Sequence, residues 1–427
     1  METICALASA PGRAGVAVIR VSGPSAFAVG QHVAGTLPPA GQHRVRALKD
    51  EAGRLLDRGL VLSFEGPNSF TGEDVVEFQV HGSIASVRAI LETLQSHPDV
   101  RRAEAGEFTK RALQNGRMDL MQVEGLADLI NAETQAQLAQ ALRTTEGDAS
   151  AEIERLRVNL VRAAALIEAT IDFVDEDVPV DVTPEVMGLI DQANSQISKL
   201  LSGIGAAERV RDGFEVAIVG PPNVGKSTLL NYLAGRDAAI TSEIAGTTRD
   251  VIEVRMEIGG LAVTLLDTAG LRDSDDEIEA KGVELALRRA ESADLRVFVG
   301  ADADWTKLEP RPEDVMLSAK DDAGVHPHGV SGATGAGVPR LLKAIEEELL
   351  SRVAGAGLAS RDRHRVALEK AKQSLDVAKR CIDEVSDSVD MAAEDLRFAI
   401  RQLESVVGRV GVEDLLDEIF SSFCIGK

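Results

Sequence analysis

The spacing of apolar residues changes along the chain and divides it into four stretches. In the first stretch, residues 1–118, short β-rich runs at 16–21, 59–64 and 75–81 alternate with glycine and proline turns. A helix is expected after Gly82. Short runs bounded by turn residues are typical of strands, so this stretch is predicted to form an α/β or α+β domain.

Helical periodicity dominates two other stretches, residues 119–212 and 357–427. Apolar residues recur every three or four positions from Ile153 to Ile171, and again after Leu368. This spacing places them on one face of a helix, and that face needs a partner to cover it. We therefore expect the two stretches to pack together as one discontinuous all-α domain; two independent helical hairpins are the alternative.

Residues 213–356, between the helical stretches, alternate strands with helices. An apolar run at 214–219 predicts a strand, and a helix is expected to begin at Lys226. Two further apolar runs separated by Gly259–Gly260 indicate a hairpin. The alternation predicts a doubly wound α/β domain, inserted into the helical domain by ends that lie close together.

Composition narrows the class of protein. The chain has 427 residues, of which 44% are apolar, so several cores can be buried. No run approaches about 18 consecutive apolar residues, and the first residues lack a secretory pattern, so we expect no membrane span or leader. Three widely spaced cysteines exclude a disulfide scaffold and a four-cysteine zinc site, and they predict a cytoplasmic location.

The formal net charge of −23 excludes nucleic-acid binding through a global basic field. Residues 1–118 nevertheless carry 13 basic and 12 acidic side chains. A polyanion would therefore favour this stretch or a local patch, although a solubilising acidic surface accounts for most of the total charge.

The strongest motif is GPPNVGKS, residues 220–227, which matches G-x-x-x-x-G-K-[ST] between a predicted strand and a predicted helix. A turn of this kind points backbone N–H groups at phosphate oxygens, and the helix N-terminus adds positive potential. Lys226 is expected to reach the β- and γ-phosphates, and Ser227 to bind Mg²⁺. The motif predicts a P-loop nucleotide site.

Two later segments supply the other phosphate-side groups of such a site. In GTTRD, residues 246–250, a threonine can close over the γ-phosphate and bind Mg²⁺. In LLDTAG, residues 265–270, Asp267 can hold the shell of Mg²⁺ and the Gly270 N–H can sense the γ-phosphate. Because these segments follow the P-loop in the order that such a site requires, a chance glycine turn at 220–227 is a poor alternative.

Two further segments predict guanine recognition. AKDD, residues 319–322, stands where guanine-specific GTPases carry N-K-x-D; Lys320 can pack along the base and Asp322 can accept both guanine N–H groups. An alanine replaces the usual asparagine, so one supporting hydrogen bond is missing. SGATG, residues 331–335, is similar to the S-A-K/R loop, and Gly332 weakens that match. Together the segments favour GTP over ATP.

The groups that activate water are less clear from the sequence. Leu271 occupies the place of the water-orienting glutamine of Ras-type enzymes and cannot hydrogen-bond water. A carboxylate of the stretch 273–279 could take over, although a charged loop is the plainer interpretation for most of its members. No arginine finger is identifiable, and Asn223 is a candidate ligand for a substitute cation.

With these motifs in order, the whole chain resembles the MnmE family, also called TrmE, of tRNA-modifying GTPases. The segments that carry the resemblance are 11–23, 66–82, 106–120, the central GTPase segment and the terminal FCIGK at 423–427. The family implies a multidomain α/β protein with an N-terminal α+β folate-binding-like domain at 1–118. It also implies a discontinuous all-α domain at 119–212 and 357–427, and an inserted Ras-like P-loop G domain at 213–356.

The resemblance further implies an activity and its partners. Family members act as homodimers with flavin-dependent MnmG, in a heterotetramer or larger complex, on C5 of the wobble uridine, position 34, of certain tRNAs. They install aminomethyl or carboxymethylaminomethyl groups, and the carbon comes from 5-formyltetrahydrofolate or a related tetrahydrofolate. GTP hydrolysis uses Mg²⁺ and is stimulated by K⁺, which supplies the charge of the missing arginine.

The same resemblance assigns residues to the sites. The implied GTP contacts are Asn223, Val224, Gly225, Lys226, Ser227, Thr228, Ser242, Thr247, Thr248, Asp267, Thr268, Ala269, Gly270, Lys320, Asp322 and Ser331. The implied Mg²⁺ ligands are Ser227 and Thr248, and those of K⁺ are Asn223, Ser242, Ile244 and Thr247. Glu279 would orient the attacking water, and Cys424 is implicated in the modification chemistry, with a lone buried thiol as the alternative. The implied folate contacts are Arg20, Glu77, Arg117 and Lys427.

Two other functions compete with this one. A regulatory RNA-binding switch of the ribosome-assembly type would share the G domain but would not need a folate pocket. A folate-dependent oxidoreductase acting alone is poorly supported, because no dinucleotide G-x-G-x-x-G unit accompanies a second Rossmann pattern.

Overall fold

The computed structural model describes residues 2–172, 181–221, 223–236, 253–267, 287–300, 308–383, 389–410, 416, 419–420, 423 and 425–426. By its contacts the chain forms two compact units, residues 1–127 with 403–427, and residues 128–402. This division is coarser than the four predicted ranges, and it groups residues 120–127 and 403–427 with the N-terminal unit. The four-domain division itself stays a prediction.

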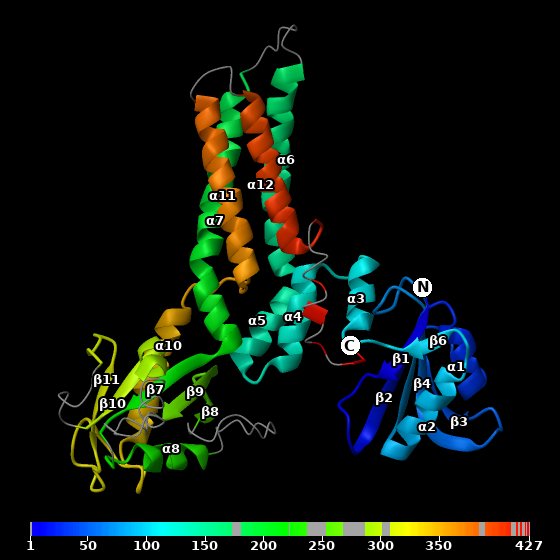
Figure 1. Ribbon diagram of the computed structural model, residues 1–427, viewed down its shortest axis with the longest axis horizontal. Helices are drawn as coiled ribbons and strands as arrows, with labels where there is room; N and C mark the ends of the chain where they lie inside the picture. The colour runs from blue at the N-terminus through cyan, green and yellow to red at the C-terminus, as the bar shows by residue number, and fades with distance from the viewer. Residues whose placement is uncertain are drawn as a thin grey trace, which may run out of the picture. The chain divides into compact units, whose positions relative to one another are not determined.

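The N-terminal unit is built on a six-stranded sheet of order β3-β4-β5-β2-β1-β6 (Figure 1). Its strands are β1 (Thr3–Leu7), β2 (Ala14–Ser22), β3 (His43–Lys49), β4 (Leu55–Phe64), β5 (Val75–Gly82) and β6 (Val100–Arg102). Its helices include α1 (Ala26–Ala34), α2 (Ile84–Gln95), α3 (Glu107–Gln114) and the first part of α4 (Leu120–Asn131). The predicted mixture of strands and helices is confirmed.

The alternation of side chains along the strands gives this sheet two different faces. Ile19 and Phe78 lie on the face that α1 and α2 cover, in one buried cluster with Leu94. The opposite face carries Ile4, which packs with Phe108 of α3 in a smaller cluster. Because Arg20 follows Ile19 on β2, its side chain belongs to this second face.

The end of the chain packs within the same unit. Ile425 forms a β-bridge with Ala105, and a Cβ added at Gly426 would lie 2.7 Å from the carbonyl carbon of Leu7. Phe420 and Phe423, with ring centroids 5.6 Å apart, join a buried cluster beneath α4. Ile425 and Gly426 of the terminal segment are therefore held within the N-terminal unit, and Gly426 lies against the end of β1.

The second unit contains a bundle of long helices that run side by side in Figure 1. They are α6 (Asp148–Asp172), α7 (Thr183–Asp212), α11 (Asp362–Asp383) and α12 (Val389–Val407), and the shorter α5 (Gln135–Thr145) lies at one end. The residues of α12 from 403 onward are counted with the other unit. Arg397 of α12 pairs with Glu168 of α6 at 2.8 Å, and Asn194 of α7 donates to Asp376 of α11 at 2.9 Å. The two helical stretches therefore pack together, as their apolar stripes predict. None of the helices in the described part of the chain is long and apolar enough to span a membrane.

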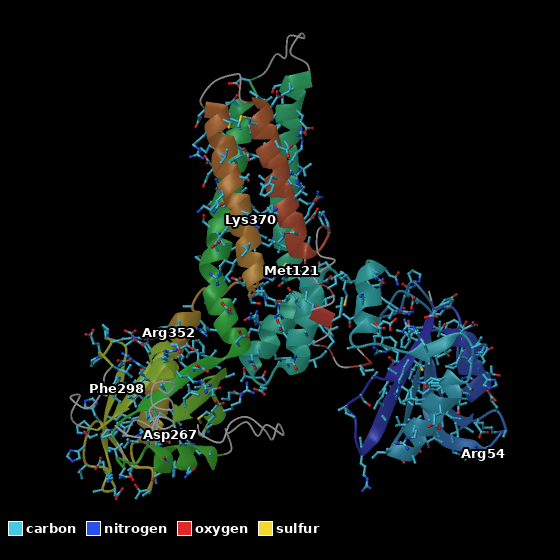
Figure 2. The ribbon with its side chains drawn as sticks, viewed as in Figure 1. Arg54, Met121, Asp267, Phe298, Arg352 and Lys370 are labelled. Carbon is cyan, nitrogen blue, oxygen red and sulfur yellow. The ribbon has the colours of Figure 1, made fainter. Side chains whose placement is uncertain are left out.

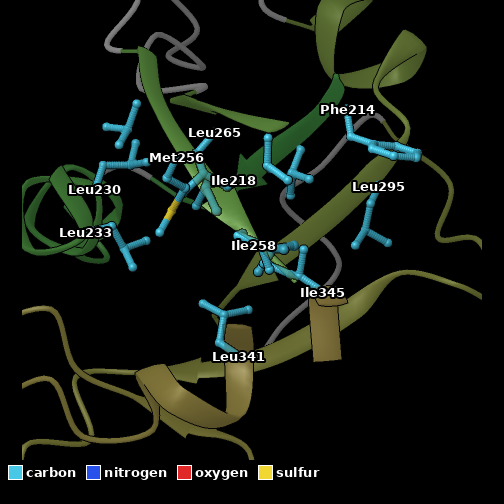
Figure 3. Close-up of a cluster of buried hydrophobic side chains, with 14 of the residues drawn as sticks. Phe214, Ile218, Leu230, Leu233, Met256, Ile258, Leu265, Leu295, Leu341 and Ile345 are labelled. Carbon is cyan, nitrogen blue, oxygen red and sulfur yellow. The ribbon is translucent and has the colours of Figure 1, made fainter. Parts of the chain in front are cut away.

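The α/β part of this unit is a second six-stranded sheet, of order β12-β11-β10-β7-β9-β8. Its elements are β7 (Phe214–Val219), α8 (Lys226–Ala234), β8 (Glu253–Ile258), β9 (Leu261–Asp267), β10 (Leu295–Val299), β11 (Val315–Ala319), β12 (Gly329–Val330) and α10 (Val338–Val353). Only β8 runs antiparallel to its neighbour, through the hairpin predicted at Gly259–Gly260. Figure 3 shows the core, where Leu230 of α8 and Ile345 of α10 meet strand residues such as Ile218.

The two ends of the α/β segment lie together, as domain insertion requires. Helix α7 ends at Asp212 and β7 begins at Phe214. The Arg211 guanidinium donates to the Ser360 carbonyl, and the Gly357 N–H donates to the Gly203 carbonyl at 3.4 Å. The entry and exit of the segment are thus bonded to each other beside the helical bundle.

A buried ion pair stabilises the α/β sheet. Arg296 of β10 lies over the ring of Phe298, labelled in Figure 2, and pairs with Asp314 at 2.5 Å; both charged side chains are at most 2% exposed. We expect Asp314→Ala to lower the free energy of unfolding by about 3–5 kcal/mol, because it leaves a buried guanidinium without its counter-charge. Urea denaturation followed by circular dichroism measures the change.

Glu347→Ala is the matched control. It removes an ion pair with Lys343 whose side chains are 73% and 69% exposed, so it should cost about 0.5 kcal/mol or less. Equal losses in the two variants would contradict this role for the Arg296–Asp314 pair.

Candidate functional site: a phosphate loop, a base loop and an N-terminal pocket

The predicted phosphate loop lies between the carboxyl end of β7 and the start of α8. Gly220 lies against the Val299 carbonyl of β10, where no Cβ would fit. Asn223 and Gly225 adopt positive φ angles of 61° and 116°, which asparagine and glycine tolerate best. These residues let the chain turn tightly into the N-terminus of α8, where backbone N–H groups are free of helical partners.

Lys226 is a buried cation within this turn. Only 5% of the residue is exposed, and its Nζ donates to the carbonyls of Gly220 at 2.7 Å and Pro221 at 3.1 Å. Burial lowers the pKa of the Lys226 ammonium, and the carboxylate of Asp267 opposes that shift. A phosphate group placed in the turn would meet a cation already poor in solvent, where a charge interaction is strong.

Ser227 and Asp267 form the magnesium side of the site. The Ser227 hydroxyl at the start of α8 donates to Asp267 Oδ2, at the end of β9, across 2.8 Å. Asp267, labelled in Figure 2, is 4% exposed. A hydroxyl and a carboxylate are oxygen donors of the kind that Mg²⁺ prefers, so these two residues fit the predicted ion.

The two predicted base-reading segments meet at one hydrogen bond. Asp322 follows β11, and its carboxylate accepts from the Ser331 hydroxyl at 2.5 Å. The same hydroxyl oxygen accepts from the N–H groups of Ala333 at 3.2 Å and Thr334 at 3.1 Å. Lys320 has a φ of 58°, so the chain turns sharply just before Asp322. The loop that holds Asp322 and the loop 331–335 are thus held together, and we call them the loop pair.

Close packing of glycines joins this loop pair to α8. A Cβ added at Gly332 would lie 2.6 Å from the Cα of Leu229, and one at Gly335 would overlap the ring of Tyr232. Gly332 therefore does not simply weaken an S-A-K/R motif, as the sequence suggested. It lets the base loop rest directly on the helix that carries the phosphate-side residues.

A second candidate site lies in the N-terminal unit. Arg20 of β2 donates from Nε to Glu77 of β5 at 2.7 Å, and its guanidinium lies over the rings of Phe70 and Phe108, 5.2 and 5.6 Å from their centroids. Arg117 lies against Gly72, which is two residues from Phe70, because a Cβ added at Gly72 would lie 3.2 Å from the Arg117 Cγ. The half-buried ion pair and the two rings form one cluster of charged and aromatic groups.

Known proteins are similar to this chain in both its N-terminal part and the remainder. The sequence model described as GTP-binding protein TrmE N-terminus matches residues 3–117, and that of the MnmE helical domain matches residues 120–424. Proteins named tRNA modification GTPase MnmE match over the full length of both chains, with 56% identity in Roseobacter denitrificans and 55% in Ruegeria pomeroyi. This chain belongs to the MnmE family of tRNA modification GTPases. Among solved structures, Aquifex aeolicus Era bound to GDP and AlF4⁻ covers 38% of this chain and 66% of its own, at 25% identity, but its TM-score of 0.24 is too low to support a structural conclusion.

In this MnmE-family chain, the described residues of the P-loop motif are contiguous in the structure, and their roles stay predictions. Asn223, Val224, Gly225, Lys226, Ser227 and Thr228 share one turn and helix start. The predicted residues that lie outside the described part of the chain are Ser242, Ile244, Thr247, Thr248, Thr268, Ala269, Gly270, Glu279, Cys424 and Lys427.

Sequence reasoning missed Phe70 and Phe108. Both stand in segments that carried the family resemblance, 66–82 and 106–120, yet their contact with Arg20 depends on how those segments fold. Cys5 was left without a role, and its burial agrees, since burial raises the pKa of this thiol to about 11 and keeps it protonated.

The contact of Gly332 with α8 yields a prediction. Gly332→Ala should raise the Kd for GTP about tenfold, equivalent to about 1.4 kcal/mol, because the added methyl must push the base loop away from Leu229. Titration calorimetry of the purified chain measures the change. Gly235→Ala, at the end of the same helix, is the control, since the nearest atoms to its added Cβ would be the carbonyl oxygens of Asn231 and Tyr232 at 3.7 Å. An unchanged Kd in the Gly332 variant would refute the tight contact.

Proposed function

We propose that this chain hydrolyses GTP to drive modification of the wobble uridine of tRNA. The observation that carries the proposal is the coexistence, in one MnmE-family chain, of the Lys226–Ser227–Asp267 phosphate site with the Arg20–Glu77 pocket. Full-length similarity to proteins named tRNA modification GTPase supports the same substrate class.

The phosphate site binds and orients the triphosphate. Lys226 neutralises the β- and γ-phosphates by exchanging its bonds to the loop carbonyls for bonds to phosphate oxygens. Ser227 and Thr248 would bind Mg²⁺, and Asp267 would hold the shell of the ion, which when bound would draw charge away from the phosphate oxygens. Asp322, oriented by Ser331, accepts the guanine N–H groups and gives the site its preference for GTP.

Water activation falls to groups other than a glutamine, since Leu271 stands in that place. We assign water orientation to Glu279. We assign K⁺ to Asn223, Ser242, Ile244 and Thr247, because an amide oxygen is a suitable ligand and no arginine finger is evident in the sequence. K⁺ would supply positive charge at the γ-phosphate, and its binding would join the G domains of a homodimer.

The N-terminal pocket would bind the one-carbon donor, 5-formyltetrahydrofolate or a related tetrahydrofolate. Arg20 and Glu77 offer a donor and an acceptor side by side, and Phe70 and Phe108 offer apolar rings. Arg117, with Lys427, adds positive charge for an anionic ligand. The flavin-dependent partner MnmG, bound in a heterotetramer or larger complex in the cytoplasm, would complete the aminomethyl or carboxymethylaminomethyl group at C5 of uridine 34; Cys424 belongs to this chemistry in the proposal.

A regulatory RNA-binding or ribosome-assembly switch is the second candidate. It would use the same phosphate and base loops and leave the uridine unchanged. The paired charges and rings at Arg20 favour the first function, since a switch has no use for a folate pocket. Binding of 5-formyltetrahydrofolate to the intact protein separates the two.

The cation assignment predicts a salt dependence. GTP hydrolysis should be faster in KCl than in NaCl at equal ionic strength, by about tenfold or more, because the larger ion suits a site built from amide and carbonyl oxygens. Asn223→Ala should remove the difference while Gly235→Ala keeps it. Phosphate release under saturating GTP measures the rates, and equal rates in both salts would contradict the assignment.

The function itself is tested in cells that lack this protein. Their tRNA should lose the C5 modification of uridine 34, and the wild-type chain should restore it. Lys226→Ala, which removes the phosphate cation, and Glu279→Ala, which should bind GTP but hydrolyse it about 10²–10⁴ times more slowly, should both fail. Asp275→Ala, in the same acidic stretch, is the control for Glu279. Fully modified tRNA in the deletion strain would rule the function out and favour the switch.

A further inference from the structure

A chain of buried charges joins α3 to the loop that precedes β5. Arg111 of α3 donates from Nη2 to Glu107 Oε1 at 3.0 Å and from Nη1 to Glu73 at 3.0 and 3.2 Å. The side chains of Arg111, Glu107 and Glu73 are only 5, 10 and 13% exposed. No step of the proposed function uses these residues. Burying three charges is costly, and only their mutual pairing and hydrogen bonds at fixed places offset that cost.

Glu73 extends this cluster to β2. One of its oxygens also accepts from the Ser22 hydroxyl at 2.7 Å, and the Ser22 and Thr71 hydroxyls are hydrogen-bonded at 2.7 Å. Asn115 donates to the Thr71 carbonyl at 2.7 Å. The loop 69–73 is thereby fixed to β2 only two residues from Arg20, and to the end of α3.

The two elements that Arg111 joins are those that contact the proposed folate residues. The loop carries Phe70, 5.2 Å from the Arg20 guanidinium, and Gly72, which lies against the Cγ of Arg117. Helix α3 carries Phe108, 5.6 Å from Arg20 on the same face of the sheet. A shift of either element would move a ring away from Arg20.

An arginine suits this position because its planar fork presents separate donors to two carboxylates at once. Burial raises the pKa of the Glu107 carboxyl, but hydrogen bonds, including those from Arg101 and Arg111, lower it further than burial raises it. The pKa therefore lies below its ordinary value, and the acid stays charged. A lysine ammonium carries its three N–H donors on a single nitrogen, so it lacks the planar fork that reaches the two carboxylates from separate nitrogens.

We propose that Arg111 is a positioning residue of the N-terminal pocket. By holding Glu107 and Glu73 it fixes Phe70 and Phe108 against Arg20, and it keeps Arg20 and Arg117 preformed for a reduced pterin with an anionic tail. The inference rests on the proposed folate site, and it adds to that site a residue that touches no ligand.

Titration calorimetry of the full-length protein with 5-formyltetrahydrofolate tests the proposal. Arg111→Lys and Glu73→Gln should each raise the Kd about tenfold or more, equivalent to about 1.4 kcal/mol. Glu73→Gln keeps the volume of the side chain and leaves the Arg111–Glu107 pair intact, so it serves if the arginine variant does not fold. The Kd for GTP should stay unchanged in both variants.

The control separates positioning from stability. Leu94→Ala removes a fully buried side chain from the core on the opposite face of the sheet, so it should lower the melting temperature without changing the Kd for folate. A merely structural Arg111 would make folate affinity follow melting temperature across all three variants. That result, or wild-type Kd values in folded Arg111→Lys and Glu73→Gln, would overturn the proposal.

The wild-type arm reports on the proposed function separately. If the wild-type protein binds folate and the Arg111 and Glu73 variants bind equally well, only the positioning role is lost. If the wild-type protein does not bind 5-formyltetrahydrofolate, the folate function fails and the positioning role is overturned with it.

Discussion

Buried cations that must keep a partner are the constraint on which both sites of this protein depend. Lys226 lies 5% exposed in the phosphate loop and is bonded to its carbonyls, and Arg111 lies equally buried between two carboxylates. A charge removed from water needs hydrogen-bonding partners at fixed places, so the surrounding backbone is held with little freedom. In the phosphate loop those partners can be exchanged for a ligand; around Arg111 they belong to the protein itself.

Close backbone approach is the second organising feature, and it gives a physical reason for the glycine at position 332. In this chain Gly332 rests on the backbone of α8, and Ser331 holds Asp322 at 2.5 Å. The close approach of Gly332 thus joins the loop that holds Ser331 to the helix that begins with Lys226 and Ser227, so the Asp322–Ser331 loop pair and the phosphate loop share one support.

The sequence was most informative where chemistry and local structure coincide in a short segment. The residues 220–227 identified a turn between a strand and a helix, and β7 ends at Val219 and α8 begins at Lys226, as that motif requires. It was less informative about Arg20, whose importance came only from family resemblance. The residues near position 20 do not predict contact with Phe70 or Phe108, because that contact forms only when the loop before β5 and helix α3 pack beside β2.

The sequence by itself determined the kinds of element, the two periodicities and the P-loop motif of a GTPase, because these are properties of neighbouring residues. Only the tertiary structure decided which distant groups meet. Arg111 and Glu73 are 38 positions apart and share an ion pair, and Gly332 has no room for a Cβ because of a helix far earlier in the chain. Such contacts depend on how sheets and helices pack in three dimensions, and the local sequence pattern does not specify which distant residues will meet.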